Sequence, residues 1–92
     1  MAQPKEYKIR YSKDALKFLS KIDRKSVDRI RNAIEGLKCT PPIGDIKLMK
    51  GYSDDRKRLR VGSYRIIYRI TAEGVVDVIW VLDIGNRGDI YK

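Results

Sequence analysis

The sequence predicts an α+β fold in which two N-terminal helices pack on one face of a largely antiparallel four-stranded sheet. Three observations support this prediction. Apolar residues recur at helical spacing in the first half of the chain, they alternate along strands in the second half, and a segment rich in proline and glycine separates the halves (Pro41, Pro42 and Gly44). A chain of 92 residues suffices for one modest core, so residues 1–92 are predicted to form a single domain.

The first half is predicted to contain one strand followed by two amphipathic helices. Residues 6–11 alternate apolar and charged side chains, as a half-buried strand does. Ser12 and Asp23 are each predicted to cap the helix that follows them, because their side chains accept hydrogen bonds from free backbone N–H groups. The apolar stripes of the two helices are Ala15, Phe18, Leu19 and Ile22, and then Val27, Ile30, Ala33, Ile34 and Leu37.

The second half is predicted to contain three strands, which are residues 56–61, 64–71 and 75–82. Gly62-Ser63 joins the first two strands, and glycine at the first turn position favours a type II′ hairpin. The third strand is apolar on both faces, which predicts a central position in the sheet. Residues 84–92 are expected to end the chain as a short strand or a turn.

Charge points to a polyanionic partner. The chain carries 21 basic and 12 acidic residues, a formal net charge of +9, and such an excess favours binding to nucleic-acid phosphates. The sequence has no 18-residue apolar run, and its first residues lack the apolar stretch of a signal peptide, so no membrane partner is expected. The single cysteine, Cys39, is consistent with a reducing compartment, and the protein is predicted to be cytoplasmic.

The sequence contains no histidine, which excludes several catalytic classes. Ser-His-Asp and Cys-His nucleophilic catalysis, histidine-based zinc sites and a ribonuclease with a histidine acid–base pair all need this residue. The sequence also shows no cluster of metal ligands, so neither a metal nor a cofactor is expected. Any proton transfer must therefore use a tyrosine, a lysine, an arginine or a carboxylate.

The predicted hairpin concentrates arginines on one face. With a two-residue turn at Gly62-Ser63, Arg60 lies opposite Arg65 and Arg56 opposite Arg69. Like charges directly opposite each other destabilise a sheet by up to about 1 kcal/mol per pair, and a bound phosphodiester would relieve that repulsion. The alternative interpretation is a solvated charged face that discourages aggregation. The face away from the core collects Arg56, Arg58, Arg60, Arg65 and Arg69.

Lys57 and Trp80 lie near this face. Whether each side chain points toward it depends on local irregularities, a bulge for Lys57 and a turn for Trp80. Lys57 has the opposite strand parity, so it joins the arginines in phosphate binding only if a bulge re-aims it. Trp80 shares the arginine face if the turn before its strand preserves parity. It would then stack on a base or contact a partner helix, while the alternative is a core position under the C-terminal segment.

Two segments resemble the signature motifs of the RelE/ParE toxin superfamily. Residues 56–68, RKRLRVGSYRIIY, resemble the pattern R-x-R-x-G-x-Y-R-x-x-Y, and residues 84–91, IGNRGDIY, resemble the C-terminal pattern G-x-R-x-x-x-Y. The initial order of strand, helix and helix is also similar to that of RelE-like toxins. The resemblance spans nearly the whole chain, and it is more specific for the superfamily than for an activity, because gyrase-poisoning ParE proteins share the fold.

The resemblance implies that the protein is the toxin of a type II toxin–antitoxin system. Such a toxin would cleave messenger RNA in the ribosomal A site, and an acidic, RelB-like antitoxin would hold it inactive. The reaction would be metal-independent attack of a ribose 2′-hydroxyl on its own 3′-phosphate. By position, Arg65 would stabilise transition-state charge and Arg87 would contact phosphate or protonate the leaving group. Tyr91 would act as base or orient the substrate. Arg56, Arg58, Arg60 and Lys57 are the expected phosphate-binding residues.

The sequence departs from the family pattern at proton-carrying positions. Arg56 and Arg58 stand where the best-known members have lysines, and Asn86 stands where many members have histidine. Arginine keeps phosphate binding but is a poor proton carrier. Two alternative functions therefore remain open, a ParE-like gyrase inhibitor and a non-catalytic basic RNA-binding module.

Overall fold

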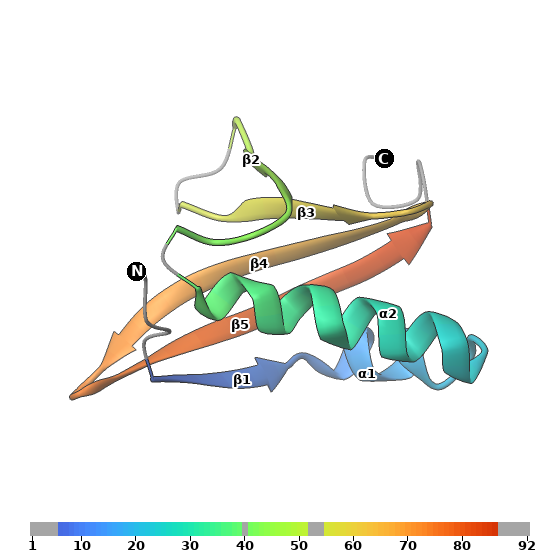
Figure 1. Ribbon diagram of the computed structural model, residues 1–92, viewed down its shortest axis with the longest axis horizontal. Coiled ribbons are helices and arrows are strands. Elements are labelled where there is room, and N and C mark those ends of the chain that lie inside the picture. Colours follow the sequence, from blue (N-terminus) through green and yellow to red (C-terminus); the bar gives the residue numbers. More distant parts are fainter. Residues whose placement is uncertain (1–5, 40, 52–54, 87–92) are drawn as a thin grey trace.

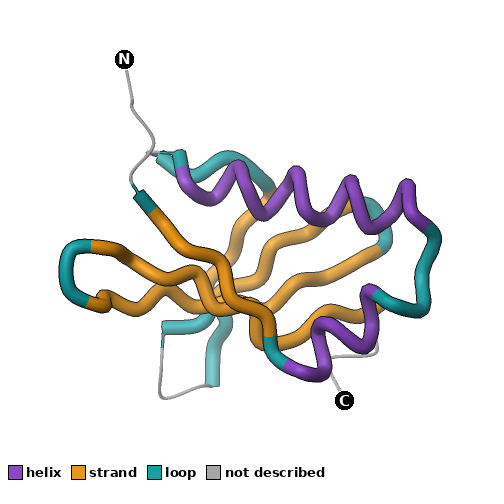
Figure 2. The backbone as a smooth tube through the Cα atoms, turned by 90° about the horizontal axis from the view of Figure 1, so that it is seen from below, coloured by secondary structure: helices purple, strands orange, loops and turns teal. Residues whose placement is uncertain are grey.

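The predicted α+β class is confirmed by a computed structural model, in which residues 6–39, 41–51 and 55–86 are described. A single mixed sheet has the strand order β1-β5-β4-β3-β2, and the helices cover one of its faces (Figures 1 and 2). The elements in chain order are β1 (Tyr7–Tyr11), α1 (Lys13–Leu19), α2 (Arg24–Glu35), the short 3-10 helix η1 (Gly36–Lys38), β2 (Asp45–Leu48), β3 (Lys57–Val61), β4 (Tyr64–Glu73) and β5 (Val76–Asn86).

The sheet has five strands rather than the predicted four. The additional strand, β2, pairs antiparallel with β3 at the sheet edge, and its Ile46 packs against the core. Its other three residues are exposed, so the segment lacks the apolar alternation by which the other strands were predicted. The remaining correction concerns length, because β5 continues to Asn86 and includes residues that the sequence placed in the tail.

β5 occupies the interior position predicted for it. It pairs antiparallel with β4 on one side and, from Asp77 to Val81, parallel with β1 on the other, so this first part of β5 lies between two neighbouring strands. Beyond Tyr11 the chain leaves the sheet and forms α1, which packs beside the second half of β5. The start and the end of the described chain are thereby joined through one strand (Figure 1).

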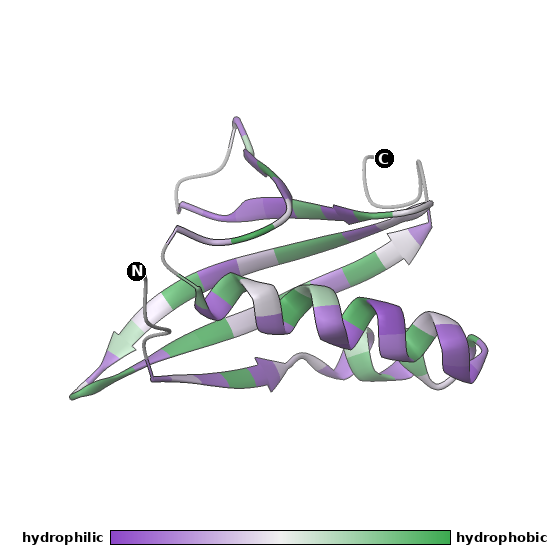
Figure 3. Ribbon diagram, viewed as in Figure 1, coloured by the Kyte–Doolittle hydropathy of each residue, from purple (hydrophilic) through white to green (hydrophobic). Residues whose placement is uncertain are grey.

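Both helices begin where their caps were predicted. The Ser12 Oγ accepts a hydrogen bond from the Ala15 N–H at 3.0 Å, and the Asp23 carboxylate accepts one from the Ser26 N–H at 3.2 Å. α2 turns its apolar stripe toward the sheet and its charged side chains outward (Figure 3). The helix stripes contribute Ala15, Ile30, Ile34 and Leu37 to the buried core.

The core lies between the helices and one face of the sheet. Strand residues at alternating positions supply most of it, and they are Leu59, Ile66, Tyr68, Ile79, Val81 and Ile84. Phe18 of α1 adds an edge-to-face contact with Tyr64 at the start of β4, with ring centroids 5.9 Å apart. The face of the sheet toward the helices therefore forms one side of the hydrophobic core.

The β3–β4 hairpin has the register that its two-residue turn predicts. Val61 pairs with Tyr64 and Arg60 with Arg65, without irregularity between the two strands. Gly62 has a φ of +59°, while no non-glycine residue of the described chain has a positive φ, and these signs match a type II′ turn. The positive φ favours glycine at this position, and a Cβ there would also lie 3.0 Å from a guanidinium nitrogen of Arg29, which would have to shift.

One β-bulge interrupts the pairing of β4 with β5. Ile67 pairs with Asp83 and Tyr68 with Val81, so Leu82 is an extra residue in β5. The backbone carbonyl of Leu82 accepts a hydrogen bond from the Ser12 hydroxyl at 2.7 Å, and the carbonyl of Val81 accepts one from the Ser12 N–H at 2.9 Å. The cap of α1 therefore also braces the bulge.

We expect Ser12→Ala to lower the free energy of unfolding by about 2 kcal/mol, because it removes both a helix cap and the hydrogen bond to Leu82. Asp23→Ala is the matched control. It removes the exposed cap of α2, with no contact to the sheet, and should cost about 1 kcal/mol. Urea unfolding of both variants measures the difference. Equal losses would show that the bond to Leu82 adds nothing to the cap.

Candidate nucleic-acid interface

One face of the sheet lies on the side opposite α2 (Figure 2). We call it the open face. Because side chains alternate along a strand, the register identifies its members as the residues between the core positions. These are Lys8 and Arg10 of β1, Val76, Val78, Trp80, Asp83 and Gly85 of β5, Arg65, Ile67, Arg69, Thr71 and Glu73 of β4, Arg58 and Arg60 of β3, and Asp45 and Lys47 of β2.

The hairpin tip places two arginines side by side. Arg60 and Arg65 are direct cross-strand partners, and a hollow of about 290 Å³ is lined by these two residues together with Gly62 and Ser63. On its other side Arg65 pairs with Gly85 of β5, which is buried, and the Nε and Nη1 atoms of Arg65 are buried as well. Two convergent guanidinium groups next to a hollow form a suitable site for a phosphate.

Arg58 is less exposed than Arg60, the other arginine that β3 places on the open face. Its side chain is 13% exposed and forms an ion pair with Asp45 of β2 at 3.5 Å. Its Nε is buried without a hydrogen-bond partner among the described residues. Asp45 therefore neutralises one arginine of the predicted set, and Arg60 is the exposed phosphate ligand on β3.

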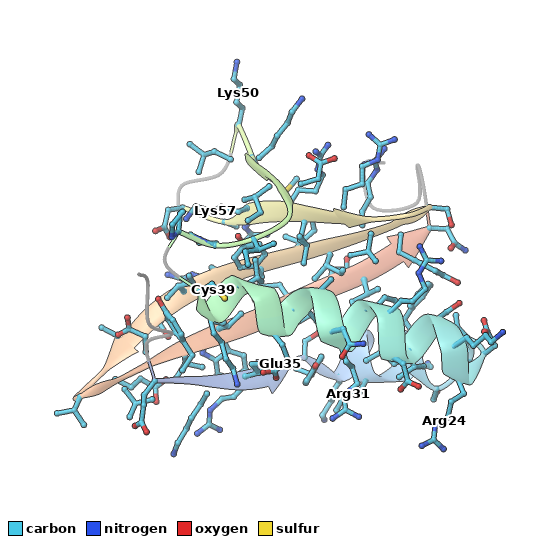
Figure 4. The ribbon with its side chains drawn as sticks, in the orientation of Figure 1. Arg24, Arg31, Glu35, Cys39, Lys50 and Lys57 are labelled. Atoms are coloured by element: carbon cyan, nitrogen blue, oxygen red, sulfur yellow. The ribbon has the colours of Figure 1, made fainter. Side chains whose placement is uncertain are left out.

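The structure does not bring Lys57 to the open face. It pairs with Tyr68 and Leu48, and no bulge interrupts β3 to re-aim it. Lys57 therefore lies on the helix side of the sheet, at the start of β3 (Figure 4). Arg56 precedes β3, is partly buried, and accepts a hydrogen bond from the Met49 N–H through its carbonyl at 3.1 Å.

A second row of basic residues crosses the open face at Trp80. Arg69 of β4 and Arg10 of β1 are the two cross-strand partners of Trp80, so the turn before β5 preserves the parity that puts Trp80 on the same face as Arg69. The Arg10 guanidinium carbon lies 5.8 Å from the centroid of the ring, within cation–π range. The sequence analysis missed Arg10, although its parity, opposite to that of Tyr7, Ile9 and Tyr11, would have placed it there.

The described part of the open face supplies positive charge but no tyrosine. Tyr64 and Tyr68 lie on the core side, where burial raises the pKa of Tyr68 to about 12. The Asp83 carboxylate is on the open face, but its Oδ1 accepts a hydrogen bond from the Ile84 N–H at 3.0 Å, next to the bulge. The predicted catalytic residues Arg87 and Tyr91 lie outside the described residues.

Two further hollows lie on the helix side of the sheet. One, of about 470 Å³, separates β1 from α2 and is lined by Ile9, Tyr11, Asp28, Arg31, Asn32 and Glu35. The other, of about 400 Å³, is lined by Tyr11, Leu16, Leu19, Ser20, Val27 and Arg31. Tyr11 and Arg31 border both hollows. Burial raises the pKa of the Tyr11 hydroxyl, and the charge of Arg31 opposes this shift.

Two features limit the chemistry of the described residues. They contain no group of three or more histidine, cysteine, aspartate or glutamate residues placed to hold a metal ion. In the same part of the chain, no helix is long and apolar enough to cross a membrane.

The fold of two helices and a five-stranded mixed sheet is similar to that of solved RelE-like toxins. The family model for the ParE toxin of type II toxin–antitoxin systems matches residues 9–91. The chain belongs to this family and is a toxin of a type II toxin–antitoxin system.

Individual relatives agree with this assignment. A putative RelE-like toxin protein from Escherichia coli is 26% identical over 87 residues, covering 94% of this chain and 90% of the relative. The RelE–RelB complex from Pyrococcus horikoshii contains a chain that is 26% identical with a TM-score of 0.70, covering 90% of this chain and 97% of that one. A chain of the RelBE2 toxin–antitoxin complex from Mycobacterium tuberculosis is 25% identical with a TM-score of 0.67, covering 92% and 100%.

We expect Arg60→Gln to weaken binding of a single-stranded oligouridylate and to reduce the salt dependence of that binding. Loss of one phosphate contact should lower the slope of log K against log salt by about 0.7. Lys57→Gln removes the same charge three residues away on the opposite face, and it should leave the slope unchanged. Fluorescence anisotropy of a labelled oligonucleotide gives both slopes. If both variants reduced the slope equally, the charge would act diffusely rather than through the open face.

Proposed function

We propose that this toxin is a metal-independent endoribonuclease that cuts messenger RNA in the ribosomal A site and so inhibits translation. The observation that carries the proposal is the row formed by Arg60, Arg65 and Gly85. Arg60 and Arg65 are cross-strand partners that line a hollow at the hairpin tip, and Gly85 is the partner of Arg65 on β5. The arrangement suits a phosphodiester whose charge increases in the transition state.

The reaction would start with the ribose 2′-hydroxyl. Its oxygen attacks the adjacent 3′-phosphate, a base removes its proton, and the bond to the 5′-oxygen of the next nucleotide breaks as that oxygen receives a proton. The products are a 2′,3′-cyclic phosphate and a 5′-hydroxyl. Arg65 stabilises the pentacoordinate phosphorane through charge-assisted hydrogen bonds. Arg87 contacts the phosphate or protonates the leaving oxygen, and Tyr91 acts as base or orients the ribose.

The position of Arg65 makes this division of roles chemically reasonable. β5 ends at Asn86, which pairs with Tyr64, the residue before Arg65. Arg87 is the next residue in the chain, and Tyr91 follows four residues later. We assign charge stabilisation to Arg65 on the open face. We assign the proton transfers to Arg87 and Tyr91, which follow β5 in the sequence.

Inhibition of gyrase is the second candidate function, and two observations favour it. The matching family model is that of the ParE toxins, and Arg58, at a position occupied by lysine in the best-known RelE-like proteins, is neutralised by Asp45. A non-catalytic RNA-binding module is the third candidate. It would use the same open face without any need for Tyr91.

We further propose that an acidic, RelB-like antitoxin holds this toxin inactive. The solved relatives from P. horikoshii and M. tuberculosis are complexes of a toxin with its antitoxin. An amphipathic segment would place apolar side chains in the hollow lined by Leu16, Leu19 and Val27, where Leu16 is 53% exposed. The acidic side chains of the antitoxin segment would complement the toxin's net charge of +9.

We expect Arg65→Ala to lower the rate of cleavage by about 100- to 1000-fold, the range for loss of one group that stabilises a transition-state charge. Arg69→Ala, at the far end of the hairpin, should cause a smaller loss. Primer extension on a translated message, with purified ribosomes and toxin, measures both. The expected cuts lie inside codons and end in a 5′-hydroxyl.

Two outcomes would contradict the ribonuclease. Intact transcripts together with trapped gyrase–DNA breaks in cells that express the toxin would establish the gyrase inhibitor instead. Equal losses in Arg65→Ala and Arg69→Ala, with Tyr91→Phe unchanged, would indicate that the arginines serve only as an electrostatic patch.

A further inference from the structure

Trp80 occupies an unusual position for a large aromatic residue. It lies on the open face, only partly buried, while the residues before and after it, Ile79 and Val81, are fully buried in the core on the other side. Val78, two residues away on the same face, is 1% exposed. The indole therefore borders an apolar part of the open face and does not belong to the main core.

Both strands that flank Trp80 place an arginine directly beside it. Arg10 of β1 and Arg69 of β4 are its register partners, and they form one row of three side chains across three strands. Arg10 is exposed and its guanidinium lies over the indole, whereas the Nε of Arg69 is buried without a hydrogen-bond partner in the described chain. Lys8, in the next row along β1, adds a further exposed charge.

This combination of groups matches the chemistry of one nucleotide. A planar indole stacks on a base of any identity, and a guanidinium binds the flanking phosphate through paired N–H donors. The row also lies on the same face as Arg65. Four residues of β4 separate Arg69 from Arg65, which corresponds to about 13 Å of strand. A short stretch of extended single strand covers that distance.

We propose that Trp80, Arg10 and Arg69 form a second nucleotide-binding site, which stacks a base of single-stranded RNA at a distance from the phosphate held by Arg60 and Arg65. The proposal deepens the proposed function and rests on it only in taking RNA as the ligand of the open face. The site positions the strand and does no chemistry. Single-stranded RNA is favoured over a protein partner because the charged side chains next to the indole, Arg10, Arg69 and Lys8, are all positive. Ile67 and Asp83 lie between this row and the row of Arg65.

The intrinsic fluorescence of the protein reports directly on this site, because Trp80 is the single tryptophan of the chain. We expect a single-stranded oligoribonucleotide to quench the emission on titration, as a stacked base does. An oligomer of the same length with abasic sugars should bind through its phosphates but leave the emission nearly unchanged. Trp80→Leu should weaken binding of the base-bearing oligomer by roughly 5- to 150-fold, the range for loss of one stacked base.

Three variants separate stacking from general electrostatics. Trp80→Phe keeps an aromatic surface and should restore most of the affinity lost in Trp80→Leu. Arg10→Gln should weaken binding and lower its salt dependence. Arg24→Gln is the matched control, since it removes the same charge from an exposed position at the start of α2 (Figure 4) and should leave both the affinity and the quenching unchanged.

The results also distinguish this site from the proposed reaction. Unchanged emission on binding of the base-bearing oligomer would overturn the second site, even if the toxin cleaves RNA on the ribosome. Quenching by an acidic amphipathic peptide but not by RNA would also overturn it and assign Trp80 to a protein interface. Quenching by RNA without any cleavage would support the site and contradict the ribonuclease. The wild-type titration decides these outcomes even if Trp80→Leu fails to fold.

Discussion

One extra residue in β5 determines which side chains share the open face. Before the bulge at Leu82, even-numbered positions of β5 face away from the helices, and after it the odd-numbered positions do so. Trp80 and Gly85 therefore lie on the same face, while Val81 and Ile84 both remain in the core. Without the bulge, either the core would lose Ile84 or the open face would lose one of its two rows. Ser12 holds this irregularity in place from the cap of α1.

The rest of the molecule follows from this division of the sheet into two faces. The helix side buries most of the apolar side chains and stabilises the fold, while the open face carries arginines beside the buried Ile67 and Val78. Neighbouring arginines repel one another there, and the ion pair of Arg58 with Asp45 offsets only part of that repulsion. A bound polyanion would supply the missing negative charge, which accounts for a stable sheet with so basic a surface.

The sequence predicted the features that depend on local pattern. The caps at Ser12 and Asp23, the type II′ turn at Gly62 and the pairing of Arg60 with Arg65 all follow from residue type and spacing. It missed β2, because this strand forms by pairing with β3 and does not alternate apolar and polar residues. It also missed the bulge, because one extra residue in β5 changes which side chains face the core without any local sequence signal. Arg10 was overlooked because its role depends on the parallel pairing of β1 with β5, a contact between the two ends of the described chain.

The central claim is that the open face holds single-stranded RNA. Ultraviolet cross-linking of a bound oligoribonucleotide, followed by mass spectrometry of the peptides, tests this claim most directly. The account predicts cross-links on the peptides of β4 and β5, including the one that contains Trp80, with fewer on α2. Cross-links confined to α1 and α2, on the helix side of the sheet, would contradict it.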